Sequence, residues 1–187
     1  ITYHIDRPQT ILTGANSGGK TSMLNLIVET HLLGMMGLFV DGNAEISLYD
    51  EMYYFKKSSG TVGSGAFEAT LKSFAEINDN PSKRSLVLAD EIESITEPGA
   101  ASKIISATLD WLSGSGNKHI ILVSHLGETL QKECPNARID GIEAKNLDEH
   151  LELVVERNPR IGYLAKSTPQ LIVERLAKKH DLPYFNF

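Results

Sequence analysis

The sequence of 187 residues predicts an α/β fold, in which helices flank a mainly parallel β-sheet. Segments with the apolar character of strands alternate with segments of helical periodicity along most of the chain, as expected for such a sheet. Two of the strand-like segments, residues 84–90 and 118–125, are almost continuously apolar. That pattern is typical of parallel strands covered on both faces, because neither face is left for polar side chains.

The expected elements alternate in the same way along the chain. Strands are expected at residues 1–5, 10–13, 37–42, 84–90 and 118–125. Helices are expected at residues 21–33, 66–77 and 99–114. The second of these helices places four apolar side chains on one stripe: Phe67, Leu71, Phe74 and Ile77.

The C-terminal part of the sequence has a different character. Residues 151–166 predict two strands joined by a turn at Asn158-Pro159. Residues 167–180 predict a helix that has a proline in its first turn and lysines near its end. We therefore expect two units, a core of residues 1–150 and a small C-terminal element of residues 151–187.

The composition restricts the classes of function. The net charge of −6 means that the surface as a whole is not suited to holding nucleic acid by neutralising its phosphates. A single cysteine, Cys134, excludes an internal disulfide framework and fits a reducing cytoplasm, where we expect the protein. No apolar run approaches membrane-spanning length, so no membrane partner is expected. Because the chain begins at Ile1 and enters a strand-like pattern at once, we expect it to be a fragment of a longer protein.

The segment between the second strand and the first helix matches the phosphate-binding pattern G-x-x-x-x-G-K-[ST]. Glycines allow successive N–H groups to point inward around a phosphate, and the following helix presents its N-terminus to the same anion. Lys20 would place a positive charge near the β- and γ-phosphates, and the hydroxyl of Thr21 is suited to ligate Mg²⁺. The sequence therefore predicts a nucleotide-binding loop, formed by Gly14, Ala15, Asn16, Ser17, Gly18, Gly19, Lys20, Thr21 and Ser22.

Acidic and imidazole side chains follow the two apolar strands. Asp90 and Glu91 stand at the end of "SLVLADE", where ligands bind in parallel sheets, and Asp90 would hold Mg²⁺. Glu91 is suited to orient or deprotonate an attacking water molecule. His125, after "LVS", ends a strand at the same sheet edge and could reach the γ-phosphate or that water. We interpret Lys20, Glu91 and His125 as candidate catalytic residues.

With these residues in place, the chain resembles the ATPase domain of the MutS family of DNA mismatch-repair and recombination proteins, which are P-loop ATPases of the ABC type. Residues 13–21 are similar to the family pattern T-G-P-N-x-G-G-K-[ST], with Ala15 in place of the proline. Residues 37–55 look like the family segment after the first helix, "SLVLADEI" matches L-V-L-x-D-E, and "SHL" is similar to T-H-[YF]. Residues 161–179 are similar to the closing helices through which these domains pair.

The chain also departs from the mismatch-repair branch of that family. After the Asp-Glu pair the branch has G-R-G-T, whereas this sequence has Glu93-Ser94-Ile95-Thr96. The S-T-F signature of the branch becomes "GSGAFEATL", and its serine is either displaced to Ser64 or replaced by Gly65. These departures favour a divergent MutS-like protein, acting in recombination or another DNA transaction, at least as much as a mismatch-specific one.

The resemblance implies a mechanism that uses ATP and Mg²⁺. Two protomers of a homodimer would sandwich ATP, each supplying the loop of residues 14–21 with Asp90, Glu91 and His125 in cis and residues 60–67 in trans. ATP would strengthen the dimer, and its hydrolysis to ADP and phosphate would release it. DNA would be held by regions upstream of this chain. For the adenine contact, Tyr3 or His4 could stack on the base, or the aromatic residue usual in the family precedes residue 1. For Tyr3, we favour the interpretation as a core aromatic residue that faces inward from a strand.

Three other classes of P-loop protein compete with this interpretation. The ATPase subunit of an ABC transporter would carry L-S-G-G-Q and a glutamine loop, and "VGSGA" is a poor substitute. An SMC-like DNA-tethering ATPase would need coiled-coil arms, and no heptads appear in this sequence. A small-molecule kinase is disfavoured because Glu91 beside Asp90 favours water as the acceptor.

Overall fold

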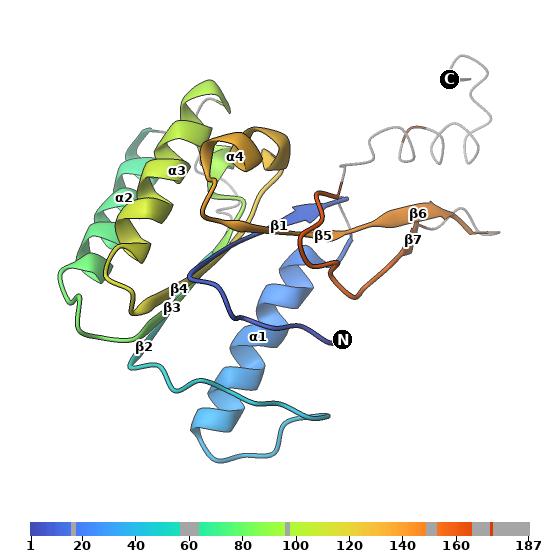
Figure 1. The fold of residues 1–187 in the computed structure, drawn as a ribbon, viewed down its shortest axis with the longest axis horizontal. Helices are drawn as coiled ribbons and strands as arrows, with labels where there is room; N and C mark the ends of the chain where they lie inside the picture. The colour runs from blue at the N-terminus through green and yellow to red at the C-terminus, as the bar shows by residue number, and fades with distance from the viewer. Residues whose placement is uncertain (16–17, 57–63, 96–97, 149–152, 166–172, 174–187) are drawn as a thin grey trace.

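A computed structural model describes residues 1–15, 18–56, 64–95, 98–148, 153–165 and 173 (Figure 1). In these residues a five-stranded sheet has the order β2-β3-β4-β1-β5, and every neighbouring pair of strands is parallel. The strands are β1 (Gln9–Gly14), β2 (Glu51–Phe55), β3 (Ser85–Asp90), β4 (Lys118–Val123) and β5 (Arg138–Ile142). The prediction of an α/β fold with a mainly parallel sheet flanked by helices is confirmed.

Helices cover both faces of this sheet, as Figure 1 shows. Helix α1 (Lys20–Met35) packs on one face, where its buried side chains Met23, Leu24 and Ile27 meet Leu86 and Leu88 of β3. The other helices cover the opposite face; they are α2 (Ser64–Asn78), α3 (Pro98–Ser113) and α4 (Gly127–Glu133). Consecutive residues of a strand point to opposite faces, so double coverage accounts for the continuous apolar runs of β3 and β4.

The expected helices form because each has an apolar stripe that the sheet can bury. In α2, Phe74 and Ile77 are buried and Leu71 packs against the same cluster, whereas the side chain of Phe67 lies outside the described residues. In α3, Ile105, Leu109 and Leu112 recur at spacings of four and three and are all buried.

Two of the expected strands are wrong. Residues 1–5 form no strand, and the segment is instead attached to β5 by side-chain hydrogen bonds. Residues 37–42 form no strand either, because Gly37 and Gly42 both have left-handed backbone angles, with φ of 72° and 84°, and the side chain of Phe39 is fully exposed. The edge position beside β3 belongs to β2, whose alternating side chains pack into the clusters on both faces.

The C-terminal strands pair differently from the prediction. A second, two-stranded sheet joins β6 (Ala144–Leu147) to β7 (Leu153–Val155) in antiparallel fashion. The segment beyond Asn158-Pro159 does not return along β7; its Arg160 forms a single antiparallel bridge with Gly141, and Gly162 turns it with φ of 69°. The expected helix of residues 167–180 lies outside the described residues except for Val173, which is helical. In the described part of the chain, no helix is long and apolar enough to cross a membrane.

Candidate nucleotide site

The glycine-rich loop begins where β1 ends and closes at the first residue of α1. Gly14 has φ of 132°, and a Cβ atom at this position would clash with the carbonyl oxygen of Ile142 on β5. Gly19, the residue before α1, has φ of 91°. Both positions therefore require the conformational freedom of glycine. Asn16 and Ser17, which we expected in this loop, lie outside the described residues.

Lys20 lies across the loop. Its side chain is buried, with 5% exposed, and its Nζ donates hydrogen bonds of 2.9 Å to the carbonyl oxygens of Gly14 and Ala15. A further hydrogen bond of 3.0 Å runs from the N–H of Gly18 to the carbonyl oxygen of Ala15. The ammonium group is therefore held inside the loop, at the N-terminus of α1, where an anion would also be favoured.

Thr21 and Asp90 connect the loop to the edge of the sheet. The hydroxyl of Thr21 donates a hydrogen bond of 2.8 Å to Oδ2 of Asp90, the last residue of β3. Asp90 is buried, and its Oδ1 has no hydrogen-bond partner among the described residues. A buried carboxylate oxygen without a partner is costly unless something else binds it.

This pair of oxygen ligands fits Mg²⁺, which is commonly held by one or two protein oxygens together with substrate phosphates and water. The hydroxyl of Thr21 and the unpartnered oxygen of Asp90 would hold the ion. In the described part of the chain, no three side chains of His, Cys, Asp or Glu gather as a metal site. A cation here would therefore depend on phosphate oxygens for the rest of its coordination.

Glu91 and His125 meet at the same edge. The carboxylate of Glu91 contacts Nε2 of His125, and their side chains are 15% and 32% exposed. Glu91 has φ of 50°, and its N–H donates a hydrogen bond of 3.0 Å to the carbonyl oxygen of Val123. A non-glycine residue in this region of backbone space is uncommon and clusters at functional sites.

Glu93 is a residue of this edge that the sequence analysis did not identify as part of the site. It lies in the 3-10 helix η1 (Ile92–Ile95) and is buried. Its Oε1 accepts hydrogen bonds from the hydroxyl of Ser124 at 2.8 Å and from the N–H of His125 at 2.7 Å. The sequence feature that could have identified Glu93 is that it is the third acidic residue, after Asp90 and Glu91, within four residues of the end of a buried strand.

A cavity of about 330 Å³ opens between the end of β1, the turn after β4 and residues 164–165. Gly14 and His125 both line it, so the first residue of the loop and the imidazole share one hollow. Ser22 is exposed on the first turn of α1. Ser64 and Gly65 open α2, but the side chain of Ser64 and residues 57–63 lie outside the described part of the chain.

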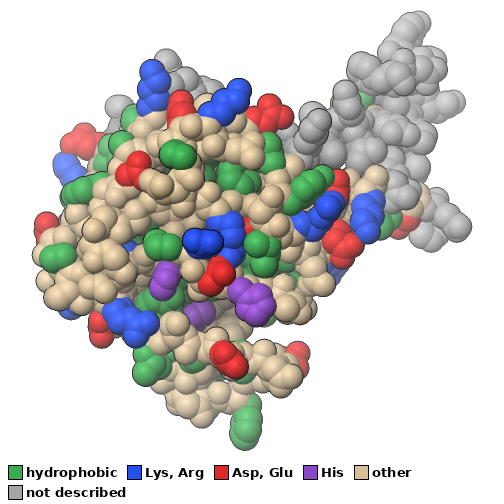
Figure 2. Space-filling model, in the orientation of Figure 1, with side chains coloured by type: hydrophobic (Ala, Val, Ile, Leu, Met, Phe, Trp, Pro, Cys, Tyr) green, Lys and Arg blue, Asp and Glu red, His purple; other side chains and the backbone are tan. Residues whose placement is uncertain are grey.

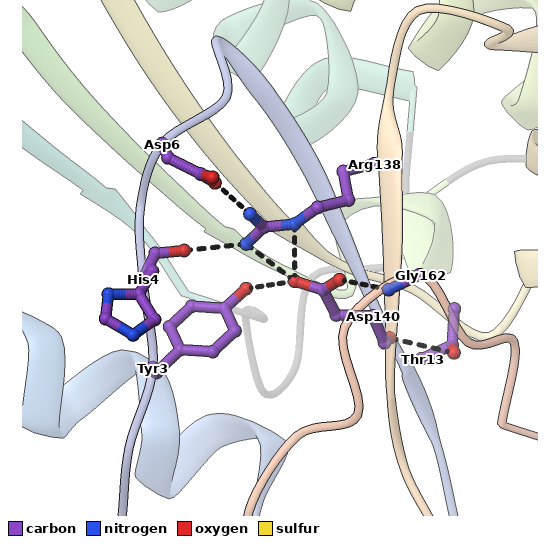
Figure 3. A network of polar contacts seen from close by, with 7 residues as sticks. All are labelled: Tyr3, His4, Asp6, Thr13, Arg138, Asp140 and Gly162. Atoms are coloured by element: carbon purple, nitrogen blue, oxygen red, sulfur yellow. Dashed lines mark hydrogen bonds and ion pairs between the residues drawn. The ribbon is translucent and has the colours of Figure 1, made fainter.

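Tyr3 belongs to a buried polar network on β5, shown in Figure 3. Its hydroxyl donates a hydrogen bond of 2.8 Å to Oδ2 of Asp140, which also accepts from Arg138. The N–H of Gly162 donates to the other carboxylate oxygen at 3.0 Å. Burial, followed by the negative charge of Asp140, raises the pKa of Tyr3. Of the two alternatives for Tyr3, this geometry and its packing against the core cluster support the core aromatic residue, while His4 is exposed.

Comparison with known proteins identifies relatives over nearly the whole chain. Residues 10–175 match the family model described as MutS domain V. The chain is 51% identical over 170 residues to the protein named DNA-binding protein MutS2 of Pyrococcus furiosus, covering 90% of this chain and 30% of that protein. It is 32% identical over 122 residues to a protein named Endonuclease MutS2 of Caldicellulosiruptor bescii, covering 63% of this chain and 15% of that protein. A Clostridium botulinum protein of the same name is 29% identical over 146 residues, covering 76% of this chain and 18% of that protein.

Proposed function

The chain belongs to the MutS family, and from this premise we propose that it is the ATPase domain of a longer MutS-like protein. In this proposal the domain is a P-loop ATPase of the ABC type that binds ATP with Mg²⁺ and hydrolyses it to ADP and phosphate to drive a DNA transaction. The observation that carries the proposal is the hydrogen bond of 2.8 Å between Thr21 and Asp90. It brings together two motifs that stand 69 residues apart, in the arrangement that a magnesium–phosphate site needs.

The loop would bind the phosphates. Gly14 and Gly19, both with positive φ, would allow main-chain N–H groups of the loop to face the anion, and Lys20 would supply a positive charge. The two carbonyl bonds of Lys20 would be exchanged for bonds to phosphate oxygens, which are charged and therefore stronger acceptors. Bound Mg²⁺, held by Thr21 and Asp90, would neutralise charge that develops on the phosphate oxygens.

Glu91 and His125 would act on the attacking water. A carboxylate next to an imidazole can orient water and accept its proton, and both side chains are partly exposed toward the sheet edge. Val123 fixes the main chain of Glu91 through its carbonyl oxygen, so the carboxylate starts from a defined position. We therefore assign to Glu91 the role of the general base and to His125 that of its partner.

The rest of the mechanism concerns the whole protein. The chain spans 30% or less of the length of the curated relatives described above. We propose that DNA is bound outside this chain and that two copies pair through the ATP site and the C-terminal element. The net charge of −6 supports the proposal that DNA is bound outside this chain. The face in Figure 2 supports it too, because positive and negative side chains of the described residues are interspersed there. The match to MutS domain V favours this function over that of a transporter subunit or an SMC-like ATPase.

Substitution of Lys20 tests the proposed function. In Lys20→Ala, binding of ATP with Mg²⁺ should weaken by at least about a hundredfold, because a buried charge aimed at the phosphates is lost. Isothermal titration calorimetry on the full-length protein measures this affinity, and Lys103→Ala, an exposed position on α3, serves as the control. Unchanged affinity in Lys20→Ala would contradict the proposed site.

A further inference from the structure

Glu93 makes two short hydrogen bonds to the turn between β4 and α4. Its exposed fraction is 9%, and the same oxygen, Oε1, accepts from the hydroxyl of Ser124 at 2.8 Å and from the N–H of His125 at 2.7 Å. Hydrogen bonds to an ionised acceptor are roughly twice as strong as neutral ones. A single buried carboxylate oxygen therefore holds two consecutive residues of the turn.

The hydrogen bonds of Glu93 extend further through Ser124. Ser124 is fully buried, and its Oγ accepts the N–H of Leu126 at 3.0 Å while donating its own proton to Glu93. Leu126 is the residue immediately before α4. The carboxylate thus orders residues 124–126 as one unit, with His125 at the centre.

The segment that follows β3 contacts the end of β4 and the turn after it at three points. The N–H of Glu91 bonds to the carbonyl oxygen of Val123, and the carboxylate of Glu91 contacts the imidazole of His125. Glu93 adds the third point and is the one that holds the main chain of His125. Without Glu93, the hydrogen bonds described for this turn would hold it through the N–H of Ser124, which donates to the carbonyl oxygen of Leu12 at 3.2 Å, and the imidazole would keep its contact with Glu91.

We propose that Glu93 is a positioning residue for His125, an inference that rests on the proposed ATPase function. Glu93 acts through the main chain of the turn and sets where the imidazole lies relative to Glu91. The second oxygen of Glu93 is buried with no hydrogen-bond partner among the described residues, a cost that packing alone does not explain.

The test compares Glu93→Ala with Glu93→Gln in the full-length protein. An amide oxygen can still accept both hydrogen bonds, whereas alanine can accept neither. Glu93→Ala should lower kcat for ATP hydrolysis by ~10- to 100-fold, the scale expected from a displaced catalytic group, and leave the KM for ATP within about twofold. Glu93→Gln should keep kcat within about threefold of the unsubstituted protein, and so should Glu29→Ala, an exposed position on α1.

Introducing Glu93→Ala into the His125→Ala variant distinguishes positioning of His125 by Glu93 from a direct role of Glu93 in hydrolysis. If Glu93 acts through His125, Glu93→Ala should reduce kcat by no more than about twofold once the imidazole is gone, because coupled residues are non-additive. The full reduction in that background would overturn the inference. Equal losses in Glu93→Ala and Glu93→Gln, or no loss in Glu93→Ala, would also overturn it.

Hydrogen exchange supplies a readout that does not depend on turnover. The amides of His125 and Leu126 should exchange at least about tenfold faster in Glu93→Ala than in Glu93→Gln, because the first donates to Glu93 and the second to the Ser124 hydroxyl that Glu93 holds. Equal exchange in the two variants would refute the positioning role. Absence of ATP turnover in the unsubstituted protein would instead refute the proposed function, and exchange would then still decide whether Glu93 holds the turn.

Discussion

The carboxylate of Glu91 and the imidazole of His125 are in contact across the ends of two neighbouring parallel strands. Asp90 pairs with Val123 in the register of β3 and β4, so Glu91, one residue beyond β3, and His125, two residues beyond β4, leave the sheet at the same edge. The left-handed backbone of Glu91 turns the chain immediately after the strand. The contact is therefore a product of strand register and one uncommon backbone angle, which together place an acid and an imidazole at the carboxyl edge of the sheet.

Replacing Glu91 by glutamine should separate binding from hydrolysis. Glutamine keeps the shape of the side chain but cannot take a proton from water, so hydrolysis should slow by ~10²–10⁴-fold while the affinity for ATP is retained. Single-turnover hydrolysis and equilibrium binding, measured on the same protein, check both parts. Near-normal turnover in Glu91→Gln would rule out the role of general base.

Replacing Asp90 by asparagine should reduce the amount by which bound MgATP stabilises the folded protein against unfolding. The amide oxygen can still accept the hydrogen bond of Thr21, but the negative charge for Mg²⁺ is gone. At a concentration of 100 times the Kd of the unsubstituted protein, MgATP stabilises by about 2.7 kcal/mol, and a tenfold loss of affinity reduces this to about 1.4 kcal/mol. Thermal unfolding with and without MgATP measures the difference.

The same substitution should not destabilise the protein without nucleotide. Asp90 buries a carboxylate whose Oδ1 has no hydrogen-bond partner among the described residues, so replacing it by a neutral amide should relieve a desolvation cost. We expect the Tm of Asp90→Asn in the absence of MgATP to equal or exceed that of the unsubstituted protein. An undiminished MgATP-induced shift in Tm would show that Asp90 does not hold the ion.

Substitutions of two glycines in the loop should lower the free energy of unfolding by different amounts. Gly14→Ala meets both an unfavourable φ and a clash with the carbonyl oxygen of Ile142, so it should lower the free energy of unfolding by about 3 kcal/mol or more. Gly19→Ala meets no atom of the described residues within 4 Å and should bear the backbone cost of about 1–2 kcal/mol. Urea denaturation of both variants tests the order, and equal losses would mean that the close approach to β5 does not constrain the loop.

The sequence predicts the centre of the fold better than its margins. The strands β3 and β4 and the helices α1, α2 and α3 were predicted because hydrophobic periodicity dominates buried elements. The edge strand β2 was missed in favour of residues 37–42, since three consecutive apolar residues between glycines resemble a strand when their exposure is unknown. The pairing of β7 with β6, and the bridge of Arg160 with Gly141 of β5, were not predicted, because local sequence does not specify which segments pair.

The candidate site was predictable where motif and topology coincide. The contacts of Lys20 with the loop, of Thr21 with Asp90, and of Glu91 with His125 all follow from a phosphate-loop pattern and strands that end at one edge. Glu93 was not predictable as part of the site, because its contacts depend on the exact path of η1. Asp140 was missed for a similar reason, since two of its partners, Tyr3 and Gly162, come from segments that are distant in sequence.

The network around Asp140 should give a distinct pH dependence. Removing the hydroxyl in Tyr3→Phe deprives a buried carboxylate of one hydrogen bond, which should cost about 1.5–3 kcal/mol at neutral pH. The pKa of Tyr3 is raised in the folded protein, first by burial and then by Asp140. The stabilisation is therefore fully present below the pKa of an unfolded tyrosine, about 10, and declines as the pH rises above it.

This decline should appear as a shrinking difference in the free energy of unfolding between the unsubstituted protein and Tyr3→Phe as the pH rises. Above pH about 10 the unfolded chain loses the tyrosine proton while the folded protein keeps it, so the advantage of the unsubstituted protein over Tyr3→Phe should fall by up to about 1.36 kcal/mol per pH unit. Urea unfolding of both proteins between pH 7 and about 11 measures the gap, and the contributions of other tyrosines cancel in the comparison. A gap that stays constant up to pH about 11 would mean that Tyr3 does not donate to Asp140 in the folded protein.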